Sequence, residues 1–287
     1  MALRILIPKG RIYDNVAQLF NDAGFQISLS DRAYRPSVSV DWLNVKIMKP
    51  QNVGDLLELG SHDAGFTGAD WIEESGADVE TILDLGFDKV SIVAAIPAGI
   101  TLEALAKRQI VAATEYVNIA ERYLRSKNFK FKIVRTYGAT EVFPPDDADM
   151  IIDNAASGKT LRDNGLEIID TITKSSTLFV ASKAAMRDSE KRGRIEELAM
   201  LFKAVLDGRE RAMLEMNVSA ENYEALVAAL PAMRSPTVSP LYGKGGVPAG
   251  YAVKIAIKRD EVSALLPRVK LMGATDIVEY DLRKVIP

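Results

Sequence analysis

The sequence contains no cysteine and only one histidine among its 287 residues. The absence of cysteine excludes disulfides, thiolate catalysis and cysteine-ligated metal sites. A single histidine excludes a multi-histidine metal site and makes a Ser-His-Asp arrangement improbable. That residue, His62, follows Gly60 and Ser61 at the expected end of a helix. A helix-terminal or loop histidine is therefore the favoured interpretation, over a catalytic one.

Long apolar runs and an excess of one charge are also absent. The apolar run Leu3–Ile7 is too short for a signal peptide, and nothing approaches the roughly 20 residues of a membrane span. We therefore expect a cytoplasmic protein. The net charge is −3 and both signs are mixed along the chain, which argues against a nucleic-acid binder. The length allows about two domains, or three small ones.

The pattern of apolar segments predicts two α/β lobes followed by a smaller domain. Short apolar runs alternate with helical patterns up to about residue 207, which favours mainly parallel sheets with helices on both faces. We expect residues 1–97 and 178–207 to form the first lobe and residues 98–177 the second, with a ligand cleft between them. Residues 208–287 follow the order β-α-β-β-α-β, which predicts a ferredoxin-like domain.

The segment 148–166 carries the most informative motif. An apolar strand runs into Asp153, and a loop of small residues then enters a helix. The first N–H groups of a helix are unpaired, and Gly158 lets the backbone approach a phosphate closely. Ser157 and Thr160 add hydroxyl donors, and Lys159 adds a cation. We predict that this loop holds a sugar phosphate, with Asp153 facing the sugar.

This segment has two alternative interpretations. Gly158-Lys159-Thr160 imitates the end of a nucleotide P-loop, but that motif requires glycine where Asp153 stands, so it is excluded. An ordinary strand-to-helix turn with Ser157 as N-cap remains open.

Three further motifs are weak individually. Pro8–Arg11 places two cations after the first strand, which suggests pyrophosphate binding or only a solvated basic loop. Gly138–Glu141 is a glycine turn leading to a carboxylate, and it could equally be a simple turn. Thr114 could cap a helix, whereas Tyr116 could stack on a base.

In combination, the order of these motifs resembles the ATP phosphoribosyltransferase family in its long form. The motifs are Ile7–Arg11, Gly65–Asp70, Ala113–Tyr116, Gly138–Glu141 and Asp153–Leu161 with Asn164-Gly165-Leu166. The resemblance spans the whole chain, because the tail shares Ser235–Leu241 and Met272–Ala274 with that family.

The resemblance implies two lobes of the periplasmic-binding-protein type and a C-terminal ferredoxin-like regulatory domain. It implies transfer of the phosphoribosyl group of phosphoribosyl pyrophosphate to N1 of ATP, with release of pyrophosphate and with Mg²⁺ as cofactor. It also implies feedback inhibition by histidine, and homodimers that assemble into homohexamers.

The resemblance also assigns residues to roles. Asp153 and Glu141 would accept hydrogen bonds from ribose hydroxyls, while Lys9 and Arg11 would neutralise pyrophosphate. Contacts to phosphoribosyl pyrophosphate are expected from Asp153, Ala156, Ser157, Gly158, Lys159, Thr160 and Leu161. Contacts to ATP are expected from Lys9, Gly10, Arg11, Asp70 and Tyr116. Histidine contacts are expected from Asn217, Thr237 and Ala274, and no protein ligand of Mg²⁺ is assigned.

The sequence departs from the family pattern at a few positions. Asn154 follows Asp153 where unrelated phosphoribosyltransferases often pair two acids, which argues against direct metal ligation there. Lys49 stands where the family would prefer arginine. Asn217 stands where relatives often carry aspartate, which weakens charge pairing with a histidine amino group. The two-lobed fold alone would also suit a non-enzymatic small-solute-binding or sensor protein.

Overall fold

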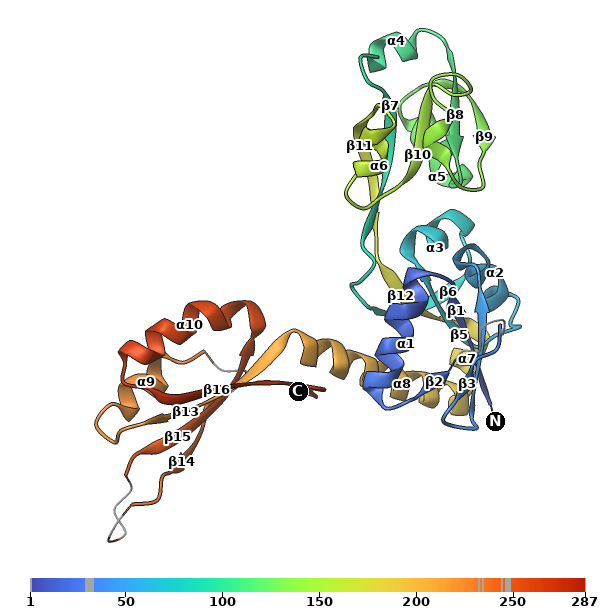
Figure 1. Ribbon diagram of the computed structural model, residues 1–287. Coiled ribbons are helices and arrows are strands. Elements are labelled where there is room, and N and C mark those ends of the chain that lie inside the picture. The colour runs from blue at the N-terminus through green and yellow to red at the C-terminus, as the bar shows by residue number, and fades with distance from the viewer. Residues whose placement is uncertain are drawn as a thin grey trace. The chain divides into compact units, whose positions relative to one another are not determined.

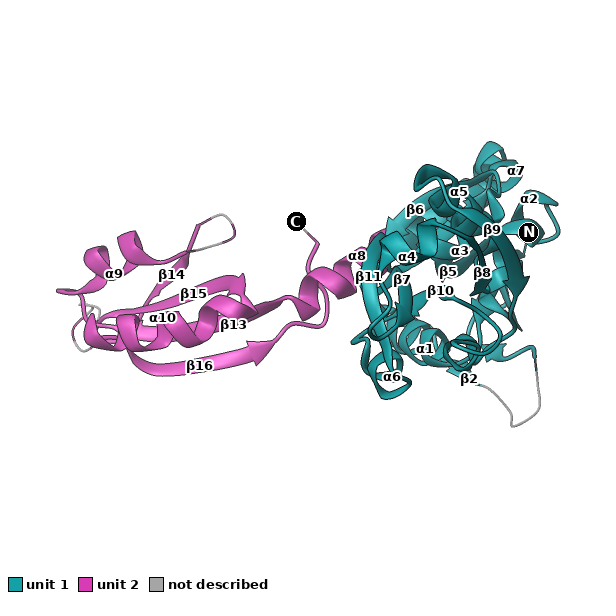
Figure 2. Ribbon diagram, turned by 90° about the horizontal axis from the view of Figure 1, so that it is seen from above, with its two compact units in different colours: residues 1–199 teal, residues 200–287 magenta. Residues whose placement is uncertain are grey.

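The computed structural model describes residues 2–28, 34–231, 233, 235–243, 245 and 249–286. The chain divides into two compact units, Met1–Ala199 and Met200–Pro287, coloured teal and magenta in Figure 2. Across the described ranges, no helix is both long and apolar enough to cross a membrane.

The first unit contains two five-stranded sheets, of which the first is built mainly from the N-terminal residues. Its strand order is β4 (Leu43–Met48), β1 (Leu3–Pro8), β5 (Ala64–Gly68), β12 (Thr177–Ser182), β6 (Val79–Asp84). Strands β4, β1 and β5 run parallel, whereas β12 pairs antiparallel with both neighbours. Its helices are α1 (Arg11–Ala23), α2 (Val53–Glu58), α3 (Ala69–Ser75), α7 (Lys183–Arg187) and the start of α8 (Ser189–Arg209).

Helix α1 shows how local sequence sets these elements. Val16, Leu19 and Phe20 recur at helical spacing and are fully buried. The helix ends at Gly24, whose left-handed φ of 110° lets its N–H return to the carbonyls of the last turn.

The second sheet has the order β11 (Leu166–Ser175), β7 (Val90–Pro97), β10 (Met150–Ala155), β8 (Gln109–Thr114), β9 (Lys130–Arg135). Helices α4 (Leu102–Ala106), α5 (Val117–Ser126) and α6 (Lys159–Asp163) accompany it, with a short 3-10 helix, η2 (Thr140–Val142). Strand β11 ends one residue before β12 begins, so a single residue, Ser176, carries the chain from one sheet to the other (Figure 1).

The limit between the lobes differs from the sequence prediction. Residues 90–97 were expected in the first lobe, yet β7 pairs with β10 and β11 in the second sheet. The last strand of the first sheet before the chain enters the second sheet is instead β6, a strand of mixed polarity whose residues are partly or fully exposed. Because β6 has no apolar run, hydrophobic periodicity did not reveal it, and the following apolar strand was assigned to the wrong sheet.

The second unit has the predicted β-α-β-β-α-β order. Its elements are β13 (Arg211–Val218), α9 (Tyr223–Ala229), β14 (Thr237–Pro240), β15 (Tyr251–Lys258), α10 (Arg259–Leu271) and β16 (Thr275–Asp281). The strands lie in the order β14-β15-β13-β16 and all pair antiparallel. Alternate residues of β13 and β15 pack against Leu226 of α9 and Leu265 of α10. The predicted fold class, two α/β lobes and a ferredoxin-like domain, is confirmed.

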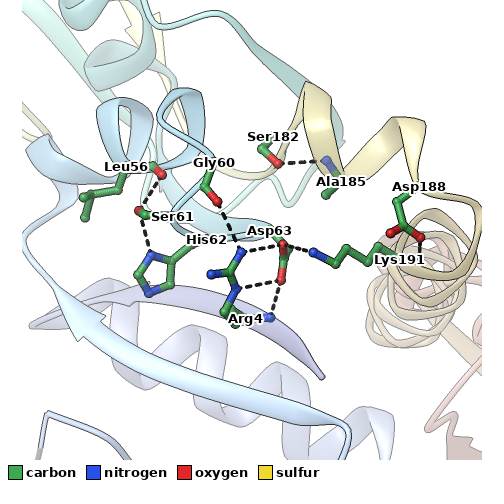
Figure 3. A network of polar contacts seen from close by, with 10 residues as sticks. All are labelled: Arg4, Leu56, Gly60, Ser61, His62, Asp63, Ser182, Ala185, Asp188 and Lys191. Atoms are coloured by element: carbon green, nitrogen blue, oxygen red, sulfur yellow. Dashed lines mark hydrogen bonds and ion pairs between the residues drawn. The ribbon is translucent and has the colours of Figure 1, made fainter. Parts of the chain in front are cut away.

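A buried carboxylate joins three segments of the first unit (Figure 3). The Asp63 side chain is 3% exposed and lies 3.1 Å from the Arg4 guanidinium and 2.8 Å from the Lys191 ammonium. Burial alone would raise the pKa of Asp63, but the hydrogen bonds from Arg4 and Lys191 outweigh it and hold that pKa below its usual range. Beside it, in the turn after α2, His62 Nδ1 lies 3.1 Å from the Ser61 hydroxyl oxygen, whose proton is donated to the Leu56 carbonyl. The non-catalytic interpretation of His62 agrees with this position.

This network predicts a stability effect. Asp63→Asn should lower the free energy of unfolding by about 3 kcal/mol at pH 7, because two cations lose their buried partner. The depressed pKa means that the carboxylate stabilises the fold above its unfolded pKa of about 3.9 and stops doing so as the pH falls through the lower folded value. The difference in the free energy of unfolding between wild type and variant, measured by chemical unfolding, should therefore become smaller below about pH 4. Asp78→Asn, which breaks the surface pair with Lys183, is the control and should cost under about 1 kcal/mol.

Candidate functional site

A cavity of about 340 Å³ gathers most of the predicted site residues. Arg11 comes from α1 beside the first sheet, and the remaining lining residues come from strands of the second sheet and from η2, the loop after β10 and α6. The lining consists of Arg11, Val90, Glu141, Asp153, Asn154, Ala155, Ala156, Ser157, Gly158, Lys159, Thr160 and Leu161. All seven residues predicted to contact phosphoribosyl pyrophosphate are in this set, together with Glu141 and Arg11.

The loop after β10 is shaped for an anion by its backbone. Gly158, rather than Ser157, occupies the N-cap of α6, with a left-handed φ of 67°. Leu161 is buried and packs in the same apolar cluster as Ile151, which anchors the helix beneath the loop. Helix α6 has only five residues, so its dipole is small, and the N–H groups of its first turn with the exposed hydroxyls of Ser157 and Thr160 are the principal donors.

Asp153 lies half-buried at the end of β10, with donors on two sides. Its Oδ1 accepts the backbone N–H of Asn154 at 2.7 Å, and the hydroxyl of buried Thr140 donates to the carboxylate. Burial raises the pKa of Asp153 to about 6, and the nearby carboxylates of Glu115 and Glu141 act in the same direction. At neutral pH Asp153 is thus mainly ionised and able to accept further hydrogen bonds.

Arg11 is oriented by a carboxylate that the sequence did not single out. Its Nε lies 2.8 Å from Oδ1 of Asp88, whose side chain is only 5% exposed. Asp88 also accepts from Asn15 at 2.9 Å and from Thr177 at 3.2 Å, so its position is fixed from three directions. The guanidinium is consequently held at the cavity with other donors available.

Lys9 and Gly10 do not line this cavity. The ammonium of Lys9 lies 3.8 Å from the ring centroid of Tyr34, and Gly10 precedes α1 with a φ of 80°. Both residues are exposed. The structure therefore brings Arg11 to the predicted site and leaves Lys9 outside its lining.

Asp70 and Tyr116, two of the residues expected to contact ATP, are buried and bonded to each other in the structure. Tyr116 is 1% exposed, and its ring stacks on Trp71 with centroids 4.4 Å apart. Its hydroxyl donates to Oδ2 of buried Asp70 at 2.7 Å, while the Ser175 hydroxyl donates to Oδ1 at 2.5 Å. Both side chains are consumed by internal contacts, so neither is available to stack on or bond with a ligand. Burial, followed by the neighbouring Asp70 charge, raises the pKa of Tyr116 far above its ordinary value.

The predicted histidine-contact residues divide between two places in the second unit. Asn217 on β13 donates to Oδ2 of Asp276 at 3.0 Å, and Ala274 lies buried two residues before that aspartate. Thr237 lies on the edge strand β14, separated from β13 by β15. The structure thus brings Asn217 and Ala274 close to Asp276, and leaves Thr237 apart.

Three residues around the cavity escaped sequence reasoning as contributors. Thr140 lies inside the Gly138–Glu141 motif, but only the acid of that motif was assigned a role. Asn154 was noted only as a departure from an acid pair. Asp88 has no motif around it, and only its positive φ of 53° and its burial in the structure reveal its role.

Comparison with known proteins gives consistent matches. The HisG family model, described as ATP phosphoribosyltransferase, matches residues 49–204, and the model for the HisG C-terminal domain matches residues 208–284. An ATP phosphoribosyltransferase of Chlorobium phaeovibrioides is 38% identical, with 99% of this chain and 97% of that protein covered. One from Thermodesulfovibrio yellowstonii is 37% identical, with 99% and 98% covered. Among solved structures, the ATP phosphoribosyl transferase (HisG:HisZ) complex from Thermotoga maritima gives a TM-score of 0.62 at 25% identity, covering 70% of this chain and 98% of that one.

Proposed function

The chain belongs to the ATP phosphoribosyltransferase family and catalyses the first step of histidine biosynthesis, and from that premise we propose that the cavity around Asp153 is its phosphoribosyl pyrophosphate site. The observation that carries this proposal is the shared lining: Asp153, Glu141, Arg11 and the loop Ala156–Leu161 surround one space. The non-enzymatic alternative is not favoured, because relatives matched over nearly the full chain are transferases.

Each group suits one part of the substrate. The 5′-phosphate lies against the loop Ala156–Leu161, where backbone N–H groups and two hydroxyls donate. Asp153 and Glu141 accept from the ribose hydroxyls, and Arg11 forks onto the pyrophosphate oxygens. Lys9 and Gly10 lie outside the lining, so their contribution to ATP binding stays a prediction.

The reaction needs alignment more than acid–base chemistry. Adenine N1 is a neutral nucleophile without a proton, so no strong base has to act before its attack on the anomeric carbon. Holding the two substrates in line can contribute about 7–11 kcal/mol of the barrier. Arg11, fixed by Asp88, stabilises the negative charge that grows on the departing pyrophosphate.

Mg²⁺ is proposed to enter with the substrate. In the part of the chain that the structure describes, no group of three or more histidine, cysteine, aspartate or glutamate side chains could hold a metal ion. The described residues therefore offer no cluster that would hold a metal by protein ligands alone, whereas Mg²⁺ commonly binds phosphate oxygens and water.

The direct test is an assay with ATP, Mg²⁺ and phosphoribosyl pyrophosphate, following phosphoribosyl-ATP by its ultraviolet absorbance. We expect product that requires both substrates. Absence of product, with tight binding of another small solute at the same cavity, would contradict the assignment.

For regulation, we propose that histidine binds the second unit and that Asp276 supplies the carboxylate lacking at position 217. Asn217 is neutral, but the Asp276 carboxylate lies 3.0 Å from its amide nitrogen. Bonds from Asn217 and Thr275 lower the pKa of Asp276, which keeps it charged. Homohexamers built from homodimers and a cytoplasmic location, where ATP and phosphoribosyl pyrophosphate are available, complete the proposal.

This placement predicts the effect of one substitution on inhibition. Asp276→Asn should weaken histidine inhibition about tenfold, since a charged acceptor for the α-amino group is lost, while activity without histidine stays unchanged. Asp281→Asn, at the other end of β16 and 86% exposed, is the matched control and should be inhibited by histidine as strongly as the wild type. Unchanged histidine sensitivity in Asp276→Asn would refute the role of Asp276.

A further inference from the structure

A chain of hydrogen bonds leads from the buried interior of the first unit to the Asp153 carboxylate. It starts at Ser175 and passes through Asp70 to the Tyr116 hydroxyl, as described above. The Asn154 side chain continues it, because its Nδ2 lies 3.2 Å from the Tyr116 hydroxyl and 3.2 Å from Oδ1 of Asp153. Ser175, Asp70, Tyr116 and Asn154, the residues that form this series of hydrogen bonds, have no other role in the proposed reaction.

We propose that Asn154 and Tyr116 are positioning residues that hold the Asp153 carboxylate in the orientation in which it accepts hydrogen bonds from the ribose of the substrate. This inference rests on the proposed role of Asp153. Neither residue is expected to contact phosphoribosyl pyrophosphate through the groups that form this chain.

The direction of each bond is fixed by the chemistry of its ends. Asp70 is a buried carboxylate and can only accept, so the Tyr116 proton points towards it and a lone pair remains for Asn154. The Asn154 amide must then present its NH₂ group to both neighbours. The flipped amide would place its carbonyl oxygen against the Asp153 carboxylate, which is repulsive. The two protons of one nitrogen thus join Tyr116 to Asp153.

Strand geometry explains why position 154 can make this connection. Successive residues of β10 face opposite sides of the sheet, so Asn154 lies on the same side as Ile152, which packs in one cluster with Tyr116. Asp153 lies on the side of Ile151 and the loop. The Asn154 side chain nevertheless curves around the backbone at the end of the strand, so that its amide nitrogen reaches the Asp153 carboxylate. An aspartate here would oppose one carboxylate with another, which accounts for the departure from an acid pair.

The environment of Asp153 makes a donor at this point valuable. Besides Asn154, the charged and titratable groups around the carboxylate are Glu115 and Glu141, which disfavour its ionisation, Tyr116, and the cations Arg11 and Lys159 on the cavity lining. Burial raises the pKa of Asp153 to about 6 even with its present donors. Removal of the Asn154 amide should raise that pKa further, because a hydrogen bond to the charged form is lost.

The test is a pH profile of kcat/KM for phosphoribosyl pyrophosphate in Asn154→Leu, a substitution of similar size at an exposed position. We expect a shift of the acidic limb upward by about one pH unit, which gives about a tenfold loss at pH 5, about a twofold loss at pH 7 and recovery to wild type at pH 9. KM for ATP should stay within about twofold of wild type, since ATP does not contact this carboxylate in the proposal. Tyr116→Phe should shift the limb in the same direction.

Two comparisons make the result decisive. Asn154→Leu and Tyr116→Phe act on one chain of bonds, so the double variant should lose no more than the more damaging single variant. Tyr123→Phe removes a partly buried hydroxyl from α5, the helix that begins directly after Tyr116; this hydroxyl is bonded to Asp170 at 3.2 Å, and its removal should leave the profile unchanged. A wild-type acidic limb in Asn154→Leu, or additive losses in the double variant, would overturn the inference. If Asp153→Asn itself retains wild-type kcat/KM, the proposed role of Asp153 fails instead.

Discussion

Asp153→Asn should lower kcat/KM for phosphoribosyl pyrophosphate by about 100-fold or more, because each lost hydrogen bond to a charged acceptor is worth about 1.5–3 kcal/mol. The carboxylate lines the cavity and is half-buried on the strand that leads into the loop Ala156–Leu161. An amide at this position would offer one acceptor oxygen and an NH₂ group, which would oppose the ribose hydroxyl donors. The loss should fall mainly on phosphoribosyl pyrophosphate, with KM for ATP changed much less.

The pH dependence gives the same prediction without mutation. Since the pKa of Asp153 is raised to about 6, protonation below that pH converts the carboxylate from an acceptor into a donor. The wild-type kcat/KM for phosphoribosyl pyrophosphate should therefore fall about tenfold per pH unit below pH 6.

The matched control for Asp153→Asn is Asp149→Asn, since Asp149 lies just before the same strand and pairs with Arg108 outside the cavity lining. Equal losses in both variants would count against a specific role for Asp153.

Gly158→Ala should raise KM for phosphoribosyl pyrophosphate by about 10- to 100-fold, since the backbone that donates to the phosphate would be displaced. Gly158 has a φ of 67°, a conformation that costs an L-residue about 1–2 kcal/mol. A Cβ there would also lie 3.1 Å from Nη1 of Arg162 and 3.1 Å from Cδ1 of Ile168, so these two side-chain ends would have to move by a few tenths of an ångström.

Gly165 provides the control for this variant. Its φ of 71° is nearly the same, but a Cβ there would meet nothing within 4 Å, and it does not line the cavity. Both alanine variants should lose similar stability in thermal unfolding from the shared backbone strain. Only Gly158→Ala should lose affinity for phosphoribosyl pyrophosphate. A similar KM change in Gly165→Ala would attribute the effect to strain rather than to the phosphate site.

Sequence reasoning was most successful where chemistry lies in contiguous residues. The segment from Asp153 to Leu161 could be read directly, because a strand, an acid, a glycine loop and a helix start are adjacent in the chain and together line the cavity. The C-terminal β-α-β-β-α-β order could likewise be predicted from alternating apolar patterns.

It failed where a role depends on distant partners. Tyr116 appeared to be an aromatic available for base stacking, but Asp70 and Trp71, some 45 residues earlier, take both its hydroxyl and its ring. Asp88 fixes Arg11 from a position 77 residues away, and no local sequence pattern predicts that pair. Burial and pairing of this kind are properties of the tertiary structure, so single-residue chemistry cannot supply them.

The most direct measurement of the central claim is a crystal structure of the enzyme with phosphoribosyl pyrophosphate and Mg²⁺. We predict density for the 5′-phosphate against the loop Ser157–Leu161, with the ribose hydroxyls within hydrogen-bond distance of Asp153 and the pyrophosphate towards Arg11. Substrate density elsewhere in the molecule, with this cavity occupied only by solvent, would contradict the account.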